Sequence, residues 1–376
     1  MIQSNAVQTT DRKVRFAVVG LGHIAQVAVL PAFGQAENAE LAALVSGDKV
    51  KLDELGSRYQ VPILTDYDEY PRLLSSGDID AVYIAVPNHL HCEYSVAAAT
   101  ARVHVLCEKP MAVTEEECWK MAEAAQASDT RLMIAYRLHF EHANLEAIEI
   151  ARSGELGEVR FFDSVFSQSV KAGDVRLVST DKGGGPVYDM GVYCINAARY
   201  LFQDEPTLVS AVTAKSDDAR FAETEEMAAV TLGFPGGKLA TFTCSFGAEG
   251  VSTYRLVGTR GQLCMERAYK YAQGTRYSVN TKHVSRTAEF GKRDQFAPEL
   301  AHFSNCVLRG AQPEPGADDG IADVRVVNAI HRAASTGRSV SLDPVPQFAR
   351  PGMRQARLVP GFEKPEEIHA SGPGAR

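Results

Sequence analysis

Two residues that could handle a substrate proton lie four positions apart, at Asp189 and Tyr193. In a helix, this spacing places a carboxylate and a phenol on the same face. Together they could serve an alcohol–carbonyl interconversion, which needs one group to accept the hydroxyl and another to carry its proton. The three glycines at 183–185 precede this pair, and they could also be no more than a flexible link.

A lysine that could join them, Lys109, comes with Glu108 directly after the apolar run Val103–Cys107. That run predicts a buried strand, and open α/β sheets bind ligands at the carboxyl ends of their strands. Glu108 and Lys109 could otherwise be solvated loop residues. A second run, Ala81–Val86, ends at the same predicted edge. It is followed by the candidate cofactor contacts Pro87, Asn88 and His91, of which His91 could simply cap the next helix and is assigned no catalytic role.

The turn Gly20-Leu21-Gly22-His23-Ile24-Ala25 follows the first predicted strand and opens a predicted helix. A lone G-x-G-x-x-G/A match is weak, but this strand–turn–helix context is the one that dinucleotide binding requires. The first glycine permits the turn, and the second lets the backbone approach a pyrophosphate at the helix N-terminus. We therefore expect Gly20, Leu21, Gly22, His23 and Ile24 to bind a dinucleotide.

The end of the second predicted strand, Leu41–Ser46, bears on the choice of cofactor. An NAD site usually has a carboxylate here that binds the ribose hydroxyls. Ser46, with Lys51 shortly after it, suits a 2′-phosphate better and favours NADP. NAD remains an alternative cofactor, because Asp48 could serve as that carboxylate after a shift of one turn.

Strands and helices are expected to alternate between residues 14 and 136, which predicts a doubly wound parallel sheet. The predicted strands are Val14–Gly20, Leu41–Ser46, Ala81–Val86, Val103–Cys107 and Leu132–Tyr136. The predicted helices are Ile24–Phe33, Lys49–Tyr59, His91–Ala101 and Thr114–Ala127.

After Tyr136, a predicted helix at Glu141–Ser153 leads into longer alternating segments, with a hairpin turn at Pro235-Gly236-Gly237. The expected class is α/β, with a Rossmann domain at 14–137 and an α+β domain at 138–342. The second domain should hold a large, open, mostly antiparallel sheet, whose uncovered face could join copies into a homo-oligomer. Residues 1–13 are expected to form an N-terminal arm, and 343–376 an extended or disordered tail.

The composition argues against several other classes of protein. No run approaches the roughly 18 apolar residues of a membrane helix, and a net charge of −8 argues against non-specific nucleic-acid binding. Seven scattered cysteines without a C-x-x-C motif predict buried free thiols rather than disulfides or a metal site. The polar start of the sequence lacks the apolar core of a secretory signal, which favours the cytoplasm.

These segments together resemble the glucose–fructose oxidoreductase, inositol dehydrogenase and MocA (Gfo/Idh/MocA) family, from about Val14 to Val340. The glycine turn, Glu108-Lys109-Pro110 and the helix with Asp189 and Tyr193 carry the resemblance. It is closest to the glucose–fructose oxidoreductase branch, as seen in Leu44-Val45-Ser46-Gly47, Ala81-Val82-Tyr83-Ile84, Tyr136-Arg137, Gly191-Val192-Tyr193, Ile195-Asn196-Ala197-Ala198-Arg199-Tyr200-Leu201 and Asp323-Val324-Arg325.

The resemblance implies roles for individual residues. Lys109 matches the catalytic lysine of the family and Asp189 its substrate-orienting aspartate, while Tyr193 stands where inositol dehydrogenases have histidine. A lysine near Tyr193 would favour its phenolate form and make it a better base. The resemblance also implies that Ser46 and Lys51 bind the 2′-phosphate of NADP, that Arg137 lies against the cofactor, and that Tyr136 and Arg176 contact the substrate.

The implied activity is the NADP-dependent oxidation of an aldose at C1 to its aldonolactone. Reduction of a second sugar by the same, tightly bound NADP is an open extension. A xylose, dihydrodiol or polyol dehydrogenase of the same family is the first alternative. A non-catalytic, NADP-sensing regulator is the second, but it is disfavoured because Lys109, Asp189 and Tyr193 are all present.

Overall fold

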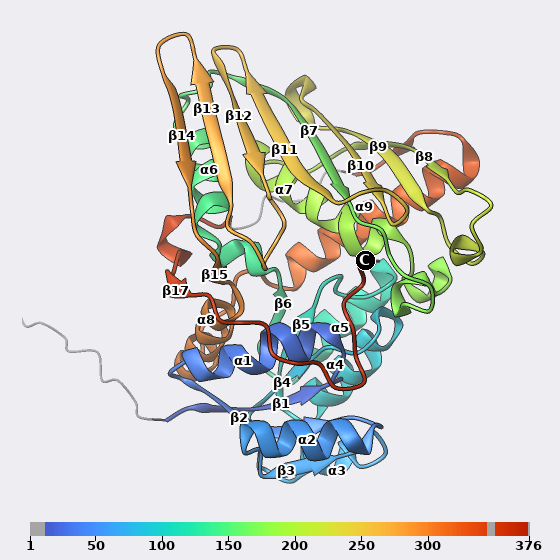
Figure 1. Cartoon of the computed structure of the whole chain (residues 1–376), viewed down its shortest axis with the longest axis vertical. Helices are drawn as coiled ribbons and strands as arrows, with labels where there is room; N and C mark the ends of the chain where they lie inside the picture. Colours follow the sequence, from blue (N-terminus) through green and yellow to red (C-terminus); the bar gives the residue numbers. More distant parts are fainter. Residues whose placement is uncertain (1–11, 344–349, 375–376) are drawn as a thin grey trace, which may run out of the picture.

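The computed structural model describes residues 12–343 and 350–374, which form two large sheets, one above the other (Figure 1), and one small two-stranded sheet. Most of the predicted N-terminal arm, residues 1–11, lies outside the described residues, as do 344–349 and 375–376 of the predicted tail. The remainder of that tail, 350–374, packs against both halves of the molecule.

The first sheet is parallel throughout. Within the described residues it has six strands, in the order β3-β2-β1-β4-β5-β6. They are β1 Val14–Val19, β2 Ala39–Val45, β3 Ile63–Thr65, β4 Ala81–Ile84, β5 His104–Glu108 and β6 Leu132–Ala135. The connecting helices are α1 Leu30–Ala32, which continues a π-helical turn at Ala25–Val29, α2 Lys49–Tyr59, α3 Tyr70–Ser75, α4 His91–Thr100 and α5 Glu115–Ala127. This is the doubly wound Rossmann architecture that the sequence predicted.

The central strands of this sheet are apolar along their whole length because helices cover both of their faces. All four residues of β4 are buried, for example, and so are five of the six in β1. The sequence did not predict β3 and α3. β3 is a three-residue edge strand without a buried residue, so it carries no continuous apolar run.

The second sheet is mixed and mostly antiparallel. In the described part of the chain its nine strands run in the order β14-β13-β12-β11-β7-β10-β9-β8-β16, and only β7 and β10 pair in parallel. The strands are β7 Val159–Ser167, β8 Leu208–Ala214, β9 Met227–Gly233, β10 Leu239–Ser245, β11 Val251–Gly258, β12 Gly261–Glu266, β13 Arg276–Thr281, β14 Ser285–Glu289 and β16 Val340–Ser341. The hairpin predicted at 235–237 joins β9 and β10.

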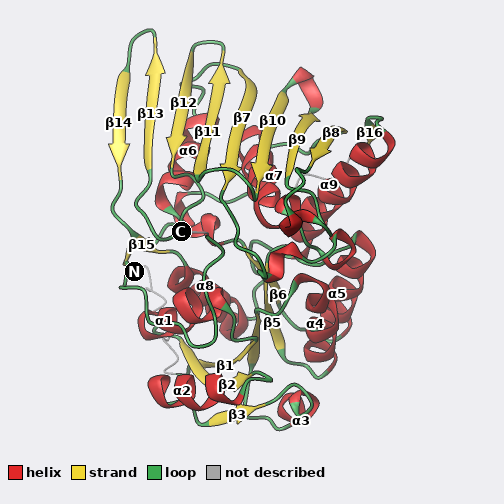
Figure 2. Cartoon of the chain, turned by 45° about the vertical axis from the view of Figure 1, so that its right-hand side comes forward, coloured by secondary structure: helices red, strands yellow, loops and turns green. Residues whose placement is uncertain are grey.

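Helices cover one face of this sheet and leave the other open (Figure 2). The covering helices are α6 His142–Arg152, α7 Val192–Phe202 and α9 Ala317–Thr336. Along β9 and β10, exposed and buried residues alternate, as expected for a sheet with a single covered face. The open face carries exposed apolar side chains, among them Phe161, Val165, Val212 and Leu239.

Two helices late in the chain tie the domains together. Although α8, Phe296–Arg309, falls within the range expected for the second domain, its residues Phe296, Leu300 and Phe303 join the core around β1. α9 contacts both α5 of the first domain and α7 of the second. The short strands β15 Arg293–Asp294 and β17 Val359–Pro360 then pair beside α8, where the C-terminal segment begins its return.

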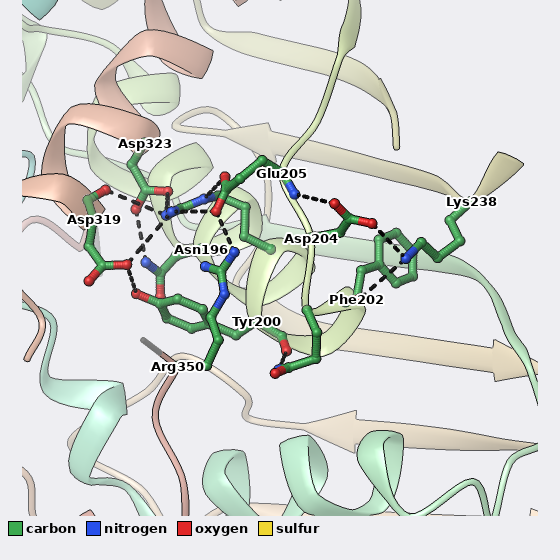
Figure 3. Close-up of polar contacts among 11 residues, drawn as sticks. Asn196, Tyr200, Phe202, Asp204, Glu205, Lys238, Asp319, Asp323 and Arg350 are labelled. Carbon is green, nitrogen blue, oxygen red and sulfur yellow. Dashed lines mark hydrogen bonds and ion pairs between the residues drawn. The ribbon is translucent and has the colours of Figure 1, made fainter. Parts of the chain in front are cut away.

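A buried cluster of charges holds α7, α9 and the C-terminal segment together (Figure 3). Arg199 is fully buried, and its guanidinium lies 2.6 Å from a carboxylate oxygen of Glu205 and 2.6 Å from one of Asp323. Asp319 lies 3.6 Å away, and Arg350 binds the other oxygen of Glu205. Breaking such a cluster is costly because it leaves a buried charge without its partner.

All seven cysteines are free, and five of them are buried, as the sequence predicted. None of the helices in residues 12–343 and 350–374 combines the length and the apolar character needed to cross a membrane.

Candidate functional site

A cavity of about 810 Å³ lies between the two domains, at the carboxyl edge of the first sheet. This edge is where ligands of doubly wound folds bind, next to the point where the strand order reverses. Every residue that the sequence nominated for cofactor binding lines this cavity: Gly20, Leu21, Gly22, His23, Ile24, Ser46, Lys51, Pro87, Asn88, His91, Glu108, Lys109 and Arg137.

The two glycines of the first turn meet different requirements. Gly20 has a φ of +95°, and a Cβ atom there would lie 2.6 Å from the carbonyl oxygen of Ala85. Gly22 faces open space, because no heavy atom lies within 4 Å of the position its Cβ would take. The turn is further held by the buried Gln26 amide, which donates to the carbonyl oxygen of Leu21 at 2.9 Å. The backbone at Gly22 therefore leaves room for a pyrophosphate.

The end of β2 forms a small polar corner of the cavity. The Ser46 hydroxyl accepts a hydrogen bond from the backbone N–H of Asp48 at 3.1 Å. The Asp48 carboxylate caps α2 by accepting from the N–H of Lys51, and it also lies 2.9 Å from Nδ1 of His369. The Asp48 carboxylate is thus engaged, whereas the Lys51 ammonium makes no ion pair with a described residue.

His91 and Glu108 reach the cavity wall but are tied into the protein. The ring nitrogens of His91 lie 2.8 Å from the carbonyl oxygen of Pro110 and 3.0 Å from that of Val86, so the ring links the ends of β4 and β5. Glu108 accepts a hydrogen bond from the Tyr83 hydroxyl at 2.8 Å, and burial raises the pKa of its carboxyl group. The absence of a catalytic role for His91 stays a prediction.

Lys109, Asp189 and Arg176 form a charged group deep in the cavity. Lys109 Nζ donates to Oδ1 of Asp189 at 2.8 Å and to its backbone oxygen at 3.0 Å. Nε of Arg176 lies 3.2 Å from Oδ2 of the same carboxylate. Burial raises the pKa of Asp189, but the two cations outweigh burial and lower it to about 2. Burial lowers the pKa of Lys109, and Asp189 reverses that effect, so both groups remain charged at neutral pH.

Short connections hold this group in place. Lys109 follows the last residue of β5, and a capping box between Thr114 and Glu117 then starts α5. Asp189 lies in a π-helical turn, Val187–Gly191, which runs directly into α7. Lys109 is thus placed by the end of a strand of the first domain, and Asp189 by the start of a helix of the second.

Tyr193, in the first turn of α7, lies close to two cations. Lys109 Nζ is 4.9 Å from the centre of its ring, and the Arg137 guanidinium is 5.0 Å from it. Phe166 packs edge-on against the same ring, with the centroids 5.7 Å apart. Both cations therefore lie close enough to interact with the π-face of the phenol ring.

Tyr136 is the one predicted site residue that the structure does not bring to the cavity. Its ring is buried in the core and stacks on His139 at 5.9 Å. Burial and the nearby Asp323 raise the pKa of its hydroxyl. Tyr136 follows β6 directly but faces the core behind the sheet edge, which corrects the expectation that it contacts the substrate.

Several lining residues were not predicted from the sequence. Phe166 is the last residue but one of β7, and Lys270 and Tyr271 lie in the loop between β12 and β13, which no local motif marks. The C-terminal segment also reaches the cavity, which is lined by His369, Ala370, Ser371, Pro373 and Gly374.

Comparison with known proteins identifies the family. Residues 14–136 match the model of an oxidoreductase family with an NAD-binding Rossmann fold, and residues 144–264 match the GFO/IDH/MocA C-terminal domain. A D-xylose 1-dehydrogenase [NADP(+)] from Haloarcula marismortui is 31% identical over 89% of this chain and 94% of its own. The chain belongs to the Gfo/Idh/MocA oxidoreductase family. The resemblance stated from the sequence is thereby confirmed.

Solved structures of the Gfo/Idh/MocA family share the whole architecture. An aldose-aldose oxidoreductase from Caulobacter crescentus, solved with glycerol, superposes with a TM-score of 0.84 at 37% identity, covering 88% of this chain and all of that one. A 3-ketoreductase from Actinomadura kijaniata, solved with NADP and TDP-benzene, gives 0.78 at 26% identity, covering 86% and 98%.

Proposed function

We propose that this protein is an NADP-dependent sugar oxidoreductase that oxidises an aldose at C1 to the aldonolactone. The observation that carries the proposal is the group formed by Lys109, Asp189, Arg176 and Tyr193 in the same cavity as the Gly20 turn. The names of the relatives support the substrate class, because they include a D-xylose 1-dehydrogenase and an aldose-aldose oxidoreductase.

The cavity fits a dinucleotide. The open space at Gly22 accommodates a pyrophosphate, and the strand ends at Pro87, Asn88 and Lys109 line the path toward Tyr193. At the other end, the Lys51 ammonium, which has no ion-pair partner among the described residues, and the Ser46 hydroxyl favour a 2′-phosphate. Asp48 is already engaged by the α2 backbone and His369, which weakens the case for a ribose-binding carboxylate and hence for NAD.

A bound nicotinamide supplies a hydride acceptor for C1 of the sugar. In the proposed mechanism, Tyr193 removes the proton of the C1 hydroxyl, so loss of proton and hydride together yields the lactone. Lys109 and Arg137 stabilise the phenolate that performs this step. Asp189 accepts hydrogen bonds from sugar hydroxyls, and Arg176 donates to the sugar while holding Asp189.

The reverse half of the cycle extends the proposal. In this half-reaction Tyr193 would return its proton to the carbonyl oxygen of a second sugar, which would become a polyol if the bound, reduced nicotinamide supplied the hydride to its carbonyl carbon. One site then serves both half-reactions by the same groups used in opposite directions.

The function can be tested with the purified protein. Absorbance at 340 nm reports co-purified NADPH, and single aldoses and aldose–ketose pairs are then added without further cofactor. Turnover of a pair, with D-glucose and D-fructose or D-xylose as probes, supports the coupled reaction, whereas turnover only with added NADP supports a simple dehydrogenase.

A variant tests the catalytic group. Lys109→Met should abolish turnover and leave NADPH binding largely intact, because the lysine acts at the reacting end of the cavity. Retention of activity in this variant would contradict the assignment. Turnover with NAD in preference to NADP would contradict the roles of Ser46 and Lys51.

A further inference from the structure

The C-terminal segment of the chain crosses the mouth of the cavity. We call residues 366–374 the strap. In Figure 1, the red C-terminal segment runs along the first domain from β17 and then turns up to end between the two sheets. The sequence left this region open as an extended arm or a disordered tail, and its described part is an extended chain anchored at many points.

The first anchor is on the glycine turn itself. The buried side chain of Gln26 makes two hydrogen bonds to the backbone of Ile368: its amide donates to the carbonyl oxygen at 2.9 Å and its oxygen accepts from the N–H at 2.8 Å. The same amide also bonds to Leu21 in the turn. The Ile368 side chain is buried in the core around β1. The strap therefore shares a side chain with the dinucleotide-binding motif.

Three further contacts bind the strap to the same wall. The Glu367 carboxylate lies 2.6 Å from Nδ1 of His23, and His369 lies 2.9 Å from Asp48. Arg58, in α2, donates to the carbonyl oxygen of Glu366 at 2.8 Å. The strap thus contacts the turn after β1, where the pyrophosphate of a dinucleotide would lie. It also contacts the polar corner after β2, where the adenosine ribose would lie.

The strap then reaches the second domain on the far side of the cavity. The backbone N–H of Lys171 donates to the carbonyl oxygen of Pro373 at 3.0 Å, and Val170 pairs with Gly374 in an antiparallel bridge. At Gly372 the chain passes so close to His23 that a Cβ would lie 3.1 Å from the imidazole ring. Between these anchors, His369, Ala370 and Ser371 line the cavity.

We propose that the strap is part of the nucleotide site and retains the dinucleotide between turnovers. The inference rests on the proposed binding of NADP. Because the strap is bonded to both walls, a bound nucleotide leaves only after several of these bonds break. Retention would make the cofactor a permanent group, so that it would be reoxidised by a second sugar instead of being exchanged for free NADP.

Release of NADPH tests the inference. Full-length protein and a chain that ends at Pro365, and so lacks the strap, are loaded with NADPH and mixed with excess NADP, and loss of NADPH fluorescence gives the release rate. The truncated chain should release NADPH at least about tenfold faster, since two or more buried hydrogen bonds are lost. A chain that ends at Gly374 is the control and should behave like the full-length protein.

A second variant covers the case in which truncation prevents folding. Glu367→Gln combined with His369→Ala removes both ion pairs with the first domain and keeps the chain length. Glu363→Gln removes an exposed acid just before the strap and is the matched control. Faster NADPH release from the double variant than from Glu363→Gln and the full-length protein supports retention of the nucleotide by the strap. Equal release rates from all of these proteins overturn it. Absence of any NADPH binding to the full-length protein would instead contradict the proposed function.

Discussion

The stability of the Asp319→Asn variant, relative to that of the wild type at the same pH, should be higher at alkaline pH than at acidic pH. The buried cluster in Figure 3 holds the three carboxyl groups of Glu205, Asp319 and Asp323 but only the two guanidinium groups of Arg199 and Arg350. One carboxyl group therefore favours its neutral form. Burial raises the pKa of Asp319 from 3.8 to about 6, with Asp323 adding to this effect and Arg199 opposing it.

The magnitude follows from that pKa. The folded protein holds the Asp319 proton more tightly than the unfolded chain does, so this group stabilises the fold fully below about pH 4. Its contribution is lost as the pH rises through about 6. The difference between 3.8 and about 6 corresponds to about 3 kcal/mol of unfolding free energy. Asparagine keeps the shape and the acceptor for the Tyr200 hydroxyl but carries no proton that titrates.

Thermal unfolding followed by circular dichroism measures the effect. Relative to the wild type, the Tm of Asp319→Asn should rise by roughly 5 °C between pH 4.5 and pH 8. Asp318→Asn is the matched control, because Asp318 is exposed in the same turn of α9, and its Tm difference should not vary with pH. A Tm difference for Asp319→Asn that stays constant across this range would refute the reasoning.

Three further outcomes can be measured. Gly20→Ala should lower the Tm and abolish NADPH binding by fluorescence titration, because its Cβ would collide with the Ala85 carbonyl group, and normal binding would contradict this. Lys51→Ala should weaken NADPH binding by roughly tenfold to a hundredfold and leave NADH binding unchanged, whereas equal losses would argue against a 2′-phosphate contact. We propose that copies of the chain join through the open face, where Val212 is 70% exposed, so Val165→Lys combined with Val212→Lys should lower the mass in light scattering from that of a wild-type oligomer to that of a monomer. An unchanged mass in the double variant would place the interface elsewhere.

Much of the first domain could be predicted because parallel strands bring their carboxyl ends to one edge. Gly20, Ser46, Asn88 and Lys109 each follow a separate apolar run, so the topology alone places them together. The sequence could not show that the Asp48 carboxylate is engaged, because one of its partners, His369, lies more than 300 residues further along the chain.

Other parts of the site left no local pattern to detect. The strap is an extended segment without helical or strand periodicity, and its anchoring depends on the buried Gln26, which looks like an ordinary residue of a helix. The substrate contact of Tyr136 was implied by the family resemblance alone, and no local pattern showed that its ring would be buried in the core. The motif residues Asn196, Arg199 and Asp323 proved to be partners in the buried cluster and not contacts of the cavity.

Transfer of deuterium tests the central claim most directly. The protein with bound NADP is mixed with D-glucose or D-xylose carrying deuterium at C1, and the reduced cofactor is examined by mass spectrometry. Our account predicts NADPH that is heavier by one deuterium, together with the aldonolactone, and no such product from Lys109→Met. Reduced cofactor without deuterium, or equal transfer by Lys109→Met, would contradict oxidation at C1 by the group around Lys109, Asp189 and Tyr193.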